Sequence, residues 1–263
     1  MPLRVIARLD VKGPNLVKGI HLEGLRVIGD PHDYAQRYYE QGADELVYVD
    51  IVASLYGRNN LVDVVERTAR DVFIPIAVGG GVRTLDDVNR LLRAGADKVA
   101  VNTAAVRNPP FIRDAARAFG SQCVIVNIEA IKQPSGSWEA FTDNGRERTG
   151  LDAIEWALRA TDLGAGELLV TSVDREGTRK GFDLELTRRI ADAVPIPVIA
   201  SGGAGSIDDV AAVIRDAHAD AVAVASLLHY GTETVTSIKA GLAARGITVP
   251  RPANAIRPTA PRD

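Results

Sequence analysis

Short apolar runs alternate with amphipathic stretches along the chain. The runs are rich in valine, isoleucine and alanine and have the length of buried strands. They span Arg4–Asp10, Glu45–Ile51, Phe73–Val78, Lys98–Asn102, Cys123–Glu129, Glu167–Ser172, Pro197–Ala200 and Asp220–Val224. The amphipathic stretches place apolar residues three and four positions apart, which is typical of one helix face. They span Pro31–Gln41, Leu61–Val72, Leu85–Ala94, Pro110–Ala118, Leu151–Leu163, Leu184–Val194, Ile207–Ala217 and Val235–Arg245.

The alternation predicts parallel strands joined by helices. Candidate helix starts stand at Thr84, Thr149 and Ser206, since hydroxyl residues cap helices well. Eight units are the number that closes such a sheet into a (β/α)8 TIM barrel. An open doubly wound sheet also fits the alternation.

The chain repeats itself. Residues 42–50 resemble residues 164–172, and residues 74–88 resemble residues 196–210. Both pairs share one offset of about half the chain, which indicates an internal duplication. Each copy holds four predicted strands, so the barrel is expected to consist of two half-barrels.

Two segments lie outside the repeat. Residues 12–30 are predicted to form a long, glycine-punctuated loop, and residues 132–148 a hairpin with an Asn-Gly turn. Both follow strands, where long connections of a barrel usually cover the site. A single barrel domain is expected over residues 1–250, followed by a flexible, proline-rich tail at residues 251–263.

Composition narrows the function classes. The 31 basic and 34 acidic residues are interspersed, whereas nucleic-acid binding needs a clustered basic face. The single cysteine excludes an intramolecular disulfide and a zinc ribbon, and the histidines lack metal-ligand spacing, so we expect neither a metal nor a cofactor. No apolar run reaches the roughly 18 residues of a membrane span, and no leader precedes the first strand. We therefore expect a cytoplasmic protein.

Glycine turns end equivalent strands of the two halves. Gly79–Gly81 is followed on the next strand by Asn102 and Thr103, and Ser201–Gly203 by Ala225 and Ser226. Glycines let backbone N–H groups approach an anion, and a hydroxyl can complete the cradle. Tight turns alone would also explain the glycines. Two related copies favour a phosphate site at each side of the barrel, and hence an elongated bisphosphorylated substrate.

Carboxylates end the first and fifth strands, at Asp10 and Glu129. Two carboxylates in one cavity can act as general acid and general base when their pKa values differ. Alternatively, each could cap a helix or pair with a lysine. Lys18, Asp50 and Asp174 are further polar candidates near the rim.

Charged residues also stand at the beginning of several predicted strands. Alternation along a strand points Arg4, Lys98 and Glu167 into the lower end of the lumen. Glu45 starts its strand at the same level, although alternation places it out of phase with Asp50. These four charges could form a neutral ring or remain solvated strand entries.

The chain resembles a known enzyme family over roughly residues 3 to 250. The resemblance rests on motifs such as Leu9-Asp-Val, Leu16-Val-Lys-Gly, Val78-Gly-Gly-Gly, Asn102-Thr-Ala-Ala-Val, Asp174-Arg-Glu-Gly-Thr and Ile199-Ala-Ser-Gly-Gly-Ala-Gly. Together they resemble the cyclase subunit of imidazole glycerol phosphate synthase. The resemblance implies a (β/α)8 barrel that works with a glutaminase subunit in histidine biosynthesis. Ammonia would add to phosphoribulosyl-formimino aminoimidazole carboxamide ribotide, giving imidazole glycerol phosphate and aminoimidazole carboxamide ribotide.

The resemblance also implies residue roles. Asp10 matches the catalytic aspartate of strand one. Polar site positions match Lys18, Asp50, Asn102 and Thr171. One phosphate site matches Gly81, Asn102 and Thr103, and the other matches Gly177, Gly203, Ala225 and Ser226. The ammonia gate matches Arg4, Glu45, Lys98 and Glu167, and Asp97 matches the face where the glutaminase docks.

Three residues depart from the family pattern. Glu129 replaces the second catalytic aspartate, Arg8 a cysteine or other small residue, and Asn127 a small apolar residue. A buried arginine needs a partner, so we expect Arg8 to pair with Glu129, or with Asp10 or Asp50. Pairing lowers a carboxylate's pKa. A pair with Glu129 would leave Asp10 as the better acid.

Several functions therefore stay open. The histidine-pathway reaction is the first hypothesis. The departures favour a paralogue that amidates another acceptor, such as a surface-glycan sugar. The sister isomerase of the pathway is disfavoured by the predicted charged ring and by the stretch Phe119–Cys123. A non-catalytic phosphate-binding module would give no turnover with any acceptor.

Overall fold

A closed barrel of parallel strands forms the centre of the molecule. The computed structural model describes residues 3–53 and 61–250. Within these ranges the barrel strands are β1 (Arg4–Lys12), β4 (Glu45–Asp50), β5 (Ile76–Gly79), β6 (Lys98–Val101), β7 (Val124–Lys132), β10 (Glu167–Ser172), β11 (Val198–Ser201) and β12 (Ala221–Val224). Each pairs in parallel with the next, and the pairing of β10 with β7 closes the ring. The predicted (β/α)8 TIM barrel is confirmed. The predicted tail, residues 251–263, lies outside the described residues.

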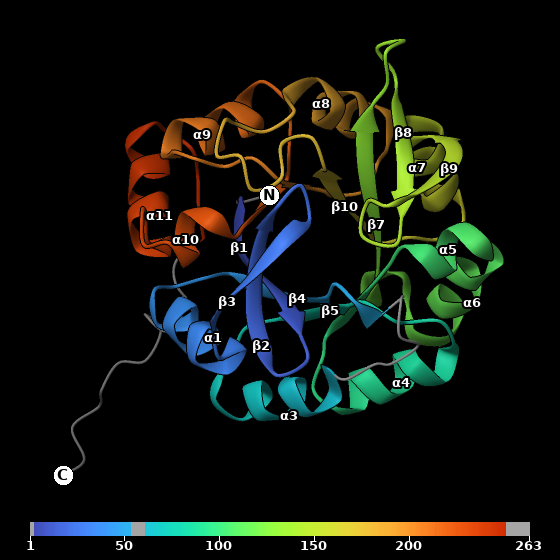
Figure 1. Cartoon of the computed structure of the whole chain (residues 1–263), viewed down its shortest axis with the longest axis horizontal. Coiled ribbons are helices and arrows are strands. Elements are labelled where there is room, and N and C mark those ends of the chain that lie inside the picture. Colours follow the sequence, from blue (N-terminus) through green and yellow to red (C-terminus); the bar gives the residue numbers. More distant parts are fainter. Residues whose placement is uncertain (1–2, 54–60, 251–263) are drawn as a thin grey trace.

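Helices surround the barrel (Figure 1). They are α1 (Pro31–Glu40), α3 (Leu61–Asp71), α4 (Leu85–Arg93), α5 (Thr103–Arg107), α6 (Pro110–Phe119), α7 (Ala153–Asp162), α8 (Leu184–Ala193), α9 (Ile207–Arg215), α10 (Ser226–His229) and α11 (Val235–Ala244), and a short 3-10 turn, η1 (Ser121–Cys123), precedes β7. The short helices α5 and α10 were not predicted, and they begin at equivalent hydroxyl residues of the two halves. None of the described helices has the length and apolar character needed to cross a membrane.

Helix starts follow local capping chemistry. Thr84 forms a capping box at the start of α4, and the Ser206 hydroxyl caps α9, as predicted. The predicted start at Thr149 is wrong. Asp152 caps α7 instead, because its carboxylate accepts the backbone N–H of Ile154 at 2.9 Å.

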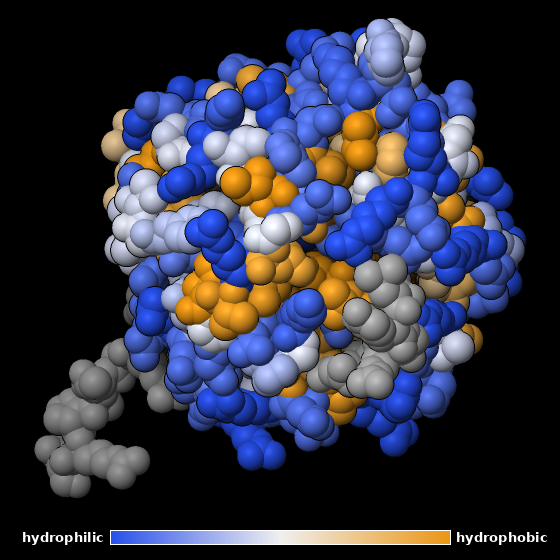
Figure 2. Space-filling model, in the orientation of Figure 1, coloured by the Kyte–Doolittle hydropathy of each residue, from blue (hydrophilic) through white to orange (hydrophobic). Residues whose placement is uncertain are grey.

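Two antiparallel hairpins rise from the barrel. The prediction of a loop at residues 12–30 is wrong, because β2 (Asn15–Ile20) and β3 (Glu23–Gly29) pair there and β2 also pairs with β1. The second hairpin, predicted around an Asn-Gly turn, is confirmed as β8 (Trp138–Thr142) and β9 (Glu147–Asp152). The β2–β3 hairpin crosses the middle of the view in Figure 1. Its exposed side chains include Ile20 and Val27, and Figure 2 shows apolar surface over this part of the molecule.

Alternation along the strands produces two apolar layers. Val5, Ala7 and Leu9 of β1 face outward and pack in the large core between barrel and helices. Ile6 faces inward and belongs to the smaller core that fills the lumen. The side chains in phase with Ile6 therefore point into the barrel. Those near the carboxyl ends of the strands form the candidate site.

Candidate active site

A cavity of about 240 Å³ opens at the carboxyl ends of the strands in the first half of the chain. Gly81, Asn102 and Thr103, the residues predicted to bind one phosphate, all line it. Arg83 and Arg107 also line it and bring positive charge to its wall. Glycine turns, a hydroxyl and cations together suit a phosphate group.

A smaller cavity of about 20 Å³ lies at the carboxyl ends of the strands in the second half. The predicted residues of the second phosphate site all line it, namely Gly177, Gly203, Ala225 and Ser226. Arg8, Lys18 and Arg179 supply positive charge. The two predicted phosphate-binding sets therefore fall in two separate cavities at the same end of the barrel.

The glycine turns of both cavities are sterically tight. Gly80 has φ +97°, and a Cβ there would lie 2.2 Å from the carbonyl oxygen of Asp50. Gly202, the equivalent residue of the second half, has φ +89°, and its Cβ would lie 2.7 Å from the carbonyl oxygen of Ser172. Both turns thus require glycine for packing, independently of any ligand.

Arg8 spans the lumen below the rim. Its Nε donates to Asp10 Oδ1 at 2.8 Å, and Nη1 donates to the hydroxyls of Thr171 at 3.0 Å and Ser201 at 3.1 Å. Burial alone would raise the pKa of Asp10, but the charges of Arg8 and Lys18 outweigh it and lower the pKa. The predicted pairing of Arg8 is present, and its partner is Asp10 rather than Glu129.

Glu129 has a different neighbour. The Asn127 side-chain amide donates to its Oε1 at 3.2 Å, and the Gly145 N–H donates to its Oε2 at 2.8 Å. Burial raises the pKa of Glu129 to about 7, and the neighbouring donors and the Arg8 charge only partly offset that effect. Asp10 is therefore held ionised while Glu129 can carry a proton at neutral pH, which reverses the assignment that an Arg8–Glu129 pair would have given.

Lys18 covers Asp10 from the β2–β3 hairpin. Its Nζ lies 3.6 Å from Asp10 Oδ2 and forms an ion pair with Glu176. Asp10 lines neither cavity. Sequence reasoning missed Glu176, although its position directly before Gly177 could have indicated it.

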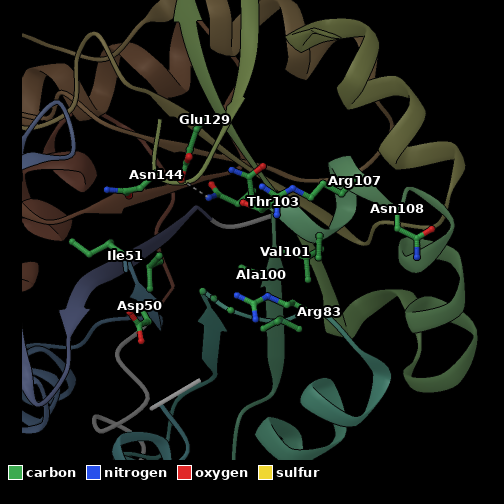
Figure 3. Close-up of a pocket in the computed structure, with 18 residues that line it drawn as sticks. Asp50, Ile51, Arg83, Ala100, Val101, Thr103, Arg107, Asn108, Glu129 and Asn144 are labelled. Atoms are coloured by element: carbon green, nitrogen blue, oxygen red, sulfur yellow. Dashed lines mark hydrogen bonds between the residues drawn. The ribbon is translucent and has the colours of Figure 1, made fainter. Parts of the chain in front are cut away.

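The other polar candidates separate. Asp50 is buried and lines the first cavity, across from Glu129 in Figure 3. Thr171 lines neither cavity, and its buried hydroxyl accepts a hydrogen bond from Arg8. Asp174 is exposed, lines neither cavity and accepts the backbone N–H of Lys132 at 2.8 Å.

The four strand-entry charges meet at the lower end of the lumen. Arg4 lies 2.8 Å from Glu45 and 2.9 Å from Glu167, and Lys98 lies 3.0 Å and 2.8 Å from the same carboxylates. Glu45 is in phase with the lumen residue Val47, so it points inward and Asp50 is the residue out of phase. The alternative of four separately solvated charges is wrong.

Asp97 precedes the strand that carries Lys98. It is exposed, and its Oδ2 accepts the backbone N–H of Ile76 at 2.8 Å. This bond gives Asp97 a structural role at the strand entry.

Comparison with known proteins agrees with this architecture. The family model described as "Histidine biosynthesis protein" matches residues 4–234. The imidazole glycerol phosphate synthase subunit HisF of Legionella pneumophila is 63% identical over 207 residues, which cover 79% of this chain and 98% of the relative. The chain therefore belongs to the histidine biosynthesis protein family, among the relatives of the HisF subunit of imidazole glycerol phosphate synthase.

Proposed function

We propose that this chain is the cyclase subunit of imidazole glycerol phosphate synthase and acts in histidine biosynthesis. The observation that carries the proposal is the 63% identity to a HisF subunit over nearly that protein's whole length. Amidation of another acceptor is not favoured by this identity. The departures at Arg8, Asn127 and Glu129 then become variations within the same reaction.

The substrate is phosphoribulosyl-formimino aminoimidazole carboxamide ribotide, which carries a phosphate at each end. One phosphate binds beside Gly81 and Thr103, and the other beside Gly203 and Ser226. This orientation places the reacting centre between the cavities, above Arg8. Both supporting cavities are lined by cations as well as glycine turns.

Proton transfers divide between the two carboxylates. The nitrogen of ammonia loses its protons as it is built into the imidazole ring, the ketone oxygen that it replaces leaves as water, and the departing aminoimidazole nitrogen gains a proton in this lyase reaction. Asp10 accepts protons, since Arg8 holds it ionised. Glu129 donates to the leaving nitrogen, because a pKa of about 7 leaves it partly protonated at neutral pH.

A glutaminase subunit supplies the ammonia. It docks at the amino-terminal face of the barrel near Asp97, below the ring of Arg4, Glu45, Lys98 and Glu167. Ammonia enters the lumen when this ring opens. The four ion pairs of the ring support a gate, because each cation is held by two carboxylates and no charge is left to bind ammonium tightly.

An assay with ammonium salts tests the cyclase without its partner. The natural protein should convert the histidine-pathway substrate to imidazole glycerol phosphate. The double variant Arg8→Cys with Glu129→Asp restores the usual family residues and serves as the matched comparison. No turnover in the natural protein, with turnover gained by the double variant, would reject the proposal in favour of another acceptor.

A further inference from the structure

The turn between β8 and β9 has an unusual backbone. Asp143, Asn144 and Gly145 follow one another with φ values of +51°, +62° and +75°. Asp143 and Asn144 are also buried. Consecutive left-handed residues other than glycine persist only where the surroundings hold them. The contacts of this turn therefore identify what holds it.

Each residue of the turn contacts a different part of the site. The N–H of Asp143 donates to the Thr103 hydroxyl at 3.2 Å. The Asn144 side-chain amide donates to the carbonyl oxygen of Leu22, at the tip of the β2–β3 hairpin, at 3.1 Å. The N–H of Gly145 donates to Glu129 at 2.8 Å. One short turn thus touches the first cavity, the hairpin and a carboxylate.

The hairpin tip continues this chain of contacts toward Asp10. Leu22 is buried, and its N–H donates to Glu176 Oε2 at 2.9 Å. The other oxygen of Glu176 pairs with Lys18, whose Nζ lies beside Asp10. The tip is therefore fastened on one side by Glu176 and on the other by Asn144.

We propose that Asn144 is a positioning residue, whose amide fastens the β2–β3 hairpin to the turn that holds Glu129, so that hairpin closure and placement of this carboxylate are coupled. The catalytic part of this inference rests on the proposed function. Asn144 lines the first cavity and lies close to Glu129 in Figure 3. It does not itself need to touch the reacting atoms.

Asparagine suits both demands of the position. It tolerates a left-handed backbone better than most residues, and its amide supplies the donor that the Leu22 carbonyl oxygen accepts. Asn144→Gly keeps the backbone conformation and removes the amide. Asn144→Asp keeps the shape and places an oxygen against the Leu22 carbonyl. The pair of variants therefore separates the hydrogen bond from backbone strain.

Two measurements that need no turnover test the coupling. Hydrogen exchange of the amides in residues 16–29 should quicken about fivefold in Asn144→Gly and more in Asn144→Asp, as expected for loss of one net hydrogen bond. The Glu129 carboxyl, followed by 13C NMR, should titrate at a shifted pH in Asn144→Gly, which adds no charge to the cavity. Arg8 and Asp10 are the charged groups that face Glu129, and neither is altered. Arg146→Ala, an exposed change in the same turn, should alter neither measurement.

Turnover with ammonium supplies the catalytic readout. The kcat of Asn144→Gly should fall about tenfold with a displaced pH profile, since small misplacements of reacting groups are costly. Unchanged exchange in the hairpin would overturn the proposal. Faster exchange with an unchanged Glu129 titration would also overturn it, because fastening would then be uncoupled from the carboxylate. If the natural protein lacks turnover, the proposed function fails, whereas the exchange and NMR results still decide the coupling.

Discussion

The two half-barrels place their carboxylates in the same way and give them different charges. In β1, Arg8 donates to Asp10 two residues ahead, and in β7, Asn127 donates to Glu129 two residues ahead. The guanidinium charge keeps the pKa of Asp10 low, whereas the neutral amide leaves burial to raise the pKa of Glu129 to about 7. Duplication supplies the geometry, and the residue beneath each carboxylate decides its protonation.

The halves also cover each other. The β2–β3 hairpin of the first half reaches the second cavity, where a Cβ on Gly177 would lie 2.5 Å from the Gly19 carbonyl oxygen. The β8–β9 hairpin of the second half reaches the first cavity, where the Asn102 amide donates to the carbonyl oxygen of Phe141 at 3.1 Å. Neither half therefore completes its own cavity, and the site needs the closed barrel.

Glu129→Gln is expected to have the largest effect, because it removes the acidic proton of the second half's carboxylate. Glutamine keeps the shape and donates no acidic proton, so kcat with ammonium should fall by about 10²–10⁴-fold, the usual contribution of general acid catalysis. In the natural protein, kcat should fall as pH rises through about 7, because the protonated form of Glu129 disappears. A natural pH profile that is flat between pH 6 and 8 would contradict the acid role.

Urea unfolding provides the control for this variant. Because the pKa of Glu129 is raised in the folded protein, this residue stabilises the fold at pH values below about 4.5, its pKa in the unfolded chain. The contribution is lost as the pH rises to about 7. The neutral glutamine avoids that loss, so above pH 7 the variant should be more stable than the natural protein by about 3 kcal/mol. Glu66→Gln, an exposed change on α3, should leave both activity and stability as they are.

Asn127→Arg makes the second half resemble the first. An arginine there adjoins the cavity of about 240 Å³, which gives the longer side chain room. Its charge should lower the pKa of Glu129, hold it ionised and reduce kcat about 100-fold at neutral pH. Asn127→Gln keeps the position neutral and should lose far less activity. Equal losses in the two variants would mean that shape rather than charge sets the role of Glu129.

The barrel could be predicted from the sequence because its signals are local or repeated. Strand and helix periods, glycine turns and the duplicated segments each depend on neighbouring residues. Alternation also placed Arg4 and Glu167 at the same level of the lumen, but it left open whether the strand-entry charges pair or stay solvated, and the folded geometry shows that they pair. The hairpin over residues 12–30 was missed, because glycines dominate its pattern while its pairing to β1 is set by tertiary contacts.

The partner of Arg8 could not be chosen from the sequence. Alternation along the strands placed both Asp10 and Glu129 within reach of Arg8. The choice between them depends on the hydroxyls of Thr171 and Ser201, which orient the guanidinium. The contacts of Lys18 with Glu176 join residues 158 positions apart. Such long-range polar contacts leave no period in the chain, so only the folded geometry reveals them.

Arg8→Asn makes the first half resemble the second. Removing one partner of a buried ion pair costs about 3–5 kcal/mol, and the lower end is expected here because Lys18 still faces Asp10. Because the pKa of Asp10 is lowered in the folded protein, this residue stabilises the fold at pH values above about 3.9, its pKa in the unfolded chain. The contribution is lost as the pH falls through the pKa of the folded state. Urea unfolding should therefore show a deficit of about 3 kcal/mol at pH 7 that shrinks below about pH 4. A deficit that stays constant with pH would assign the loss to packing.

The smallest expected effect lies at the lower ring, where Glu45 and Glu167 occupy equivalent strands and share both cations. Glu45 is 2% exposed, and burial outweighs the two cations and raises its pKa. Glu167 is 12% exposed, and although burial also tends to raise its pKa, the contacts with Arg4 and Lys98 prevail and lower it. Ionised Glu167 thus stabilises the fold at pH 7, whereas ionised Glu45 does not.

Urea unfolding at pH 7 should show that Glu167→Gln costs about 1 kcal/mol more than Glu45→Gln, a size typical of partly solvated pairs. The difference should shrink toward pH 4, because the Glu167 contribution is lost as pH falls. Equal costs at pH 7 would mean that the ring treats its two carboxylates alike, and that the asymmetry between the halves is confined to the rim.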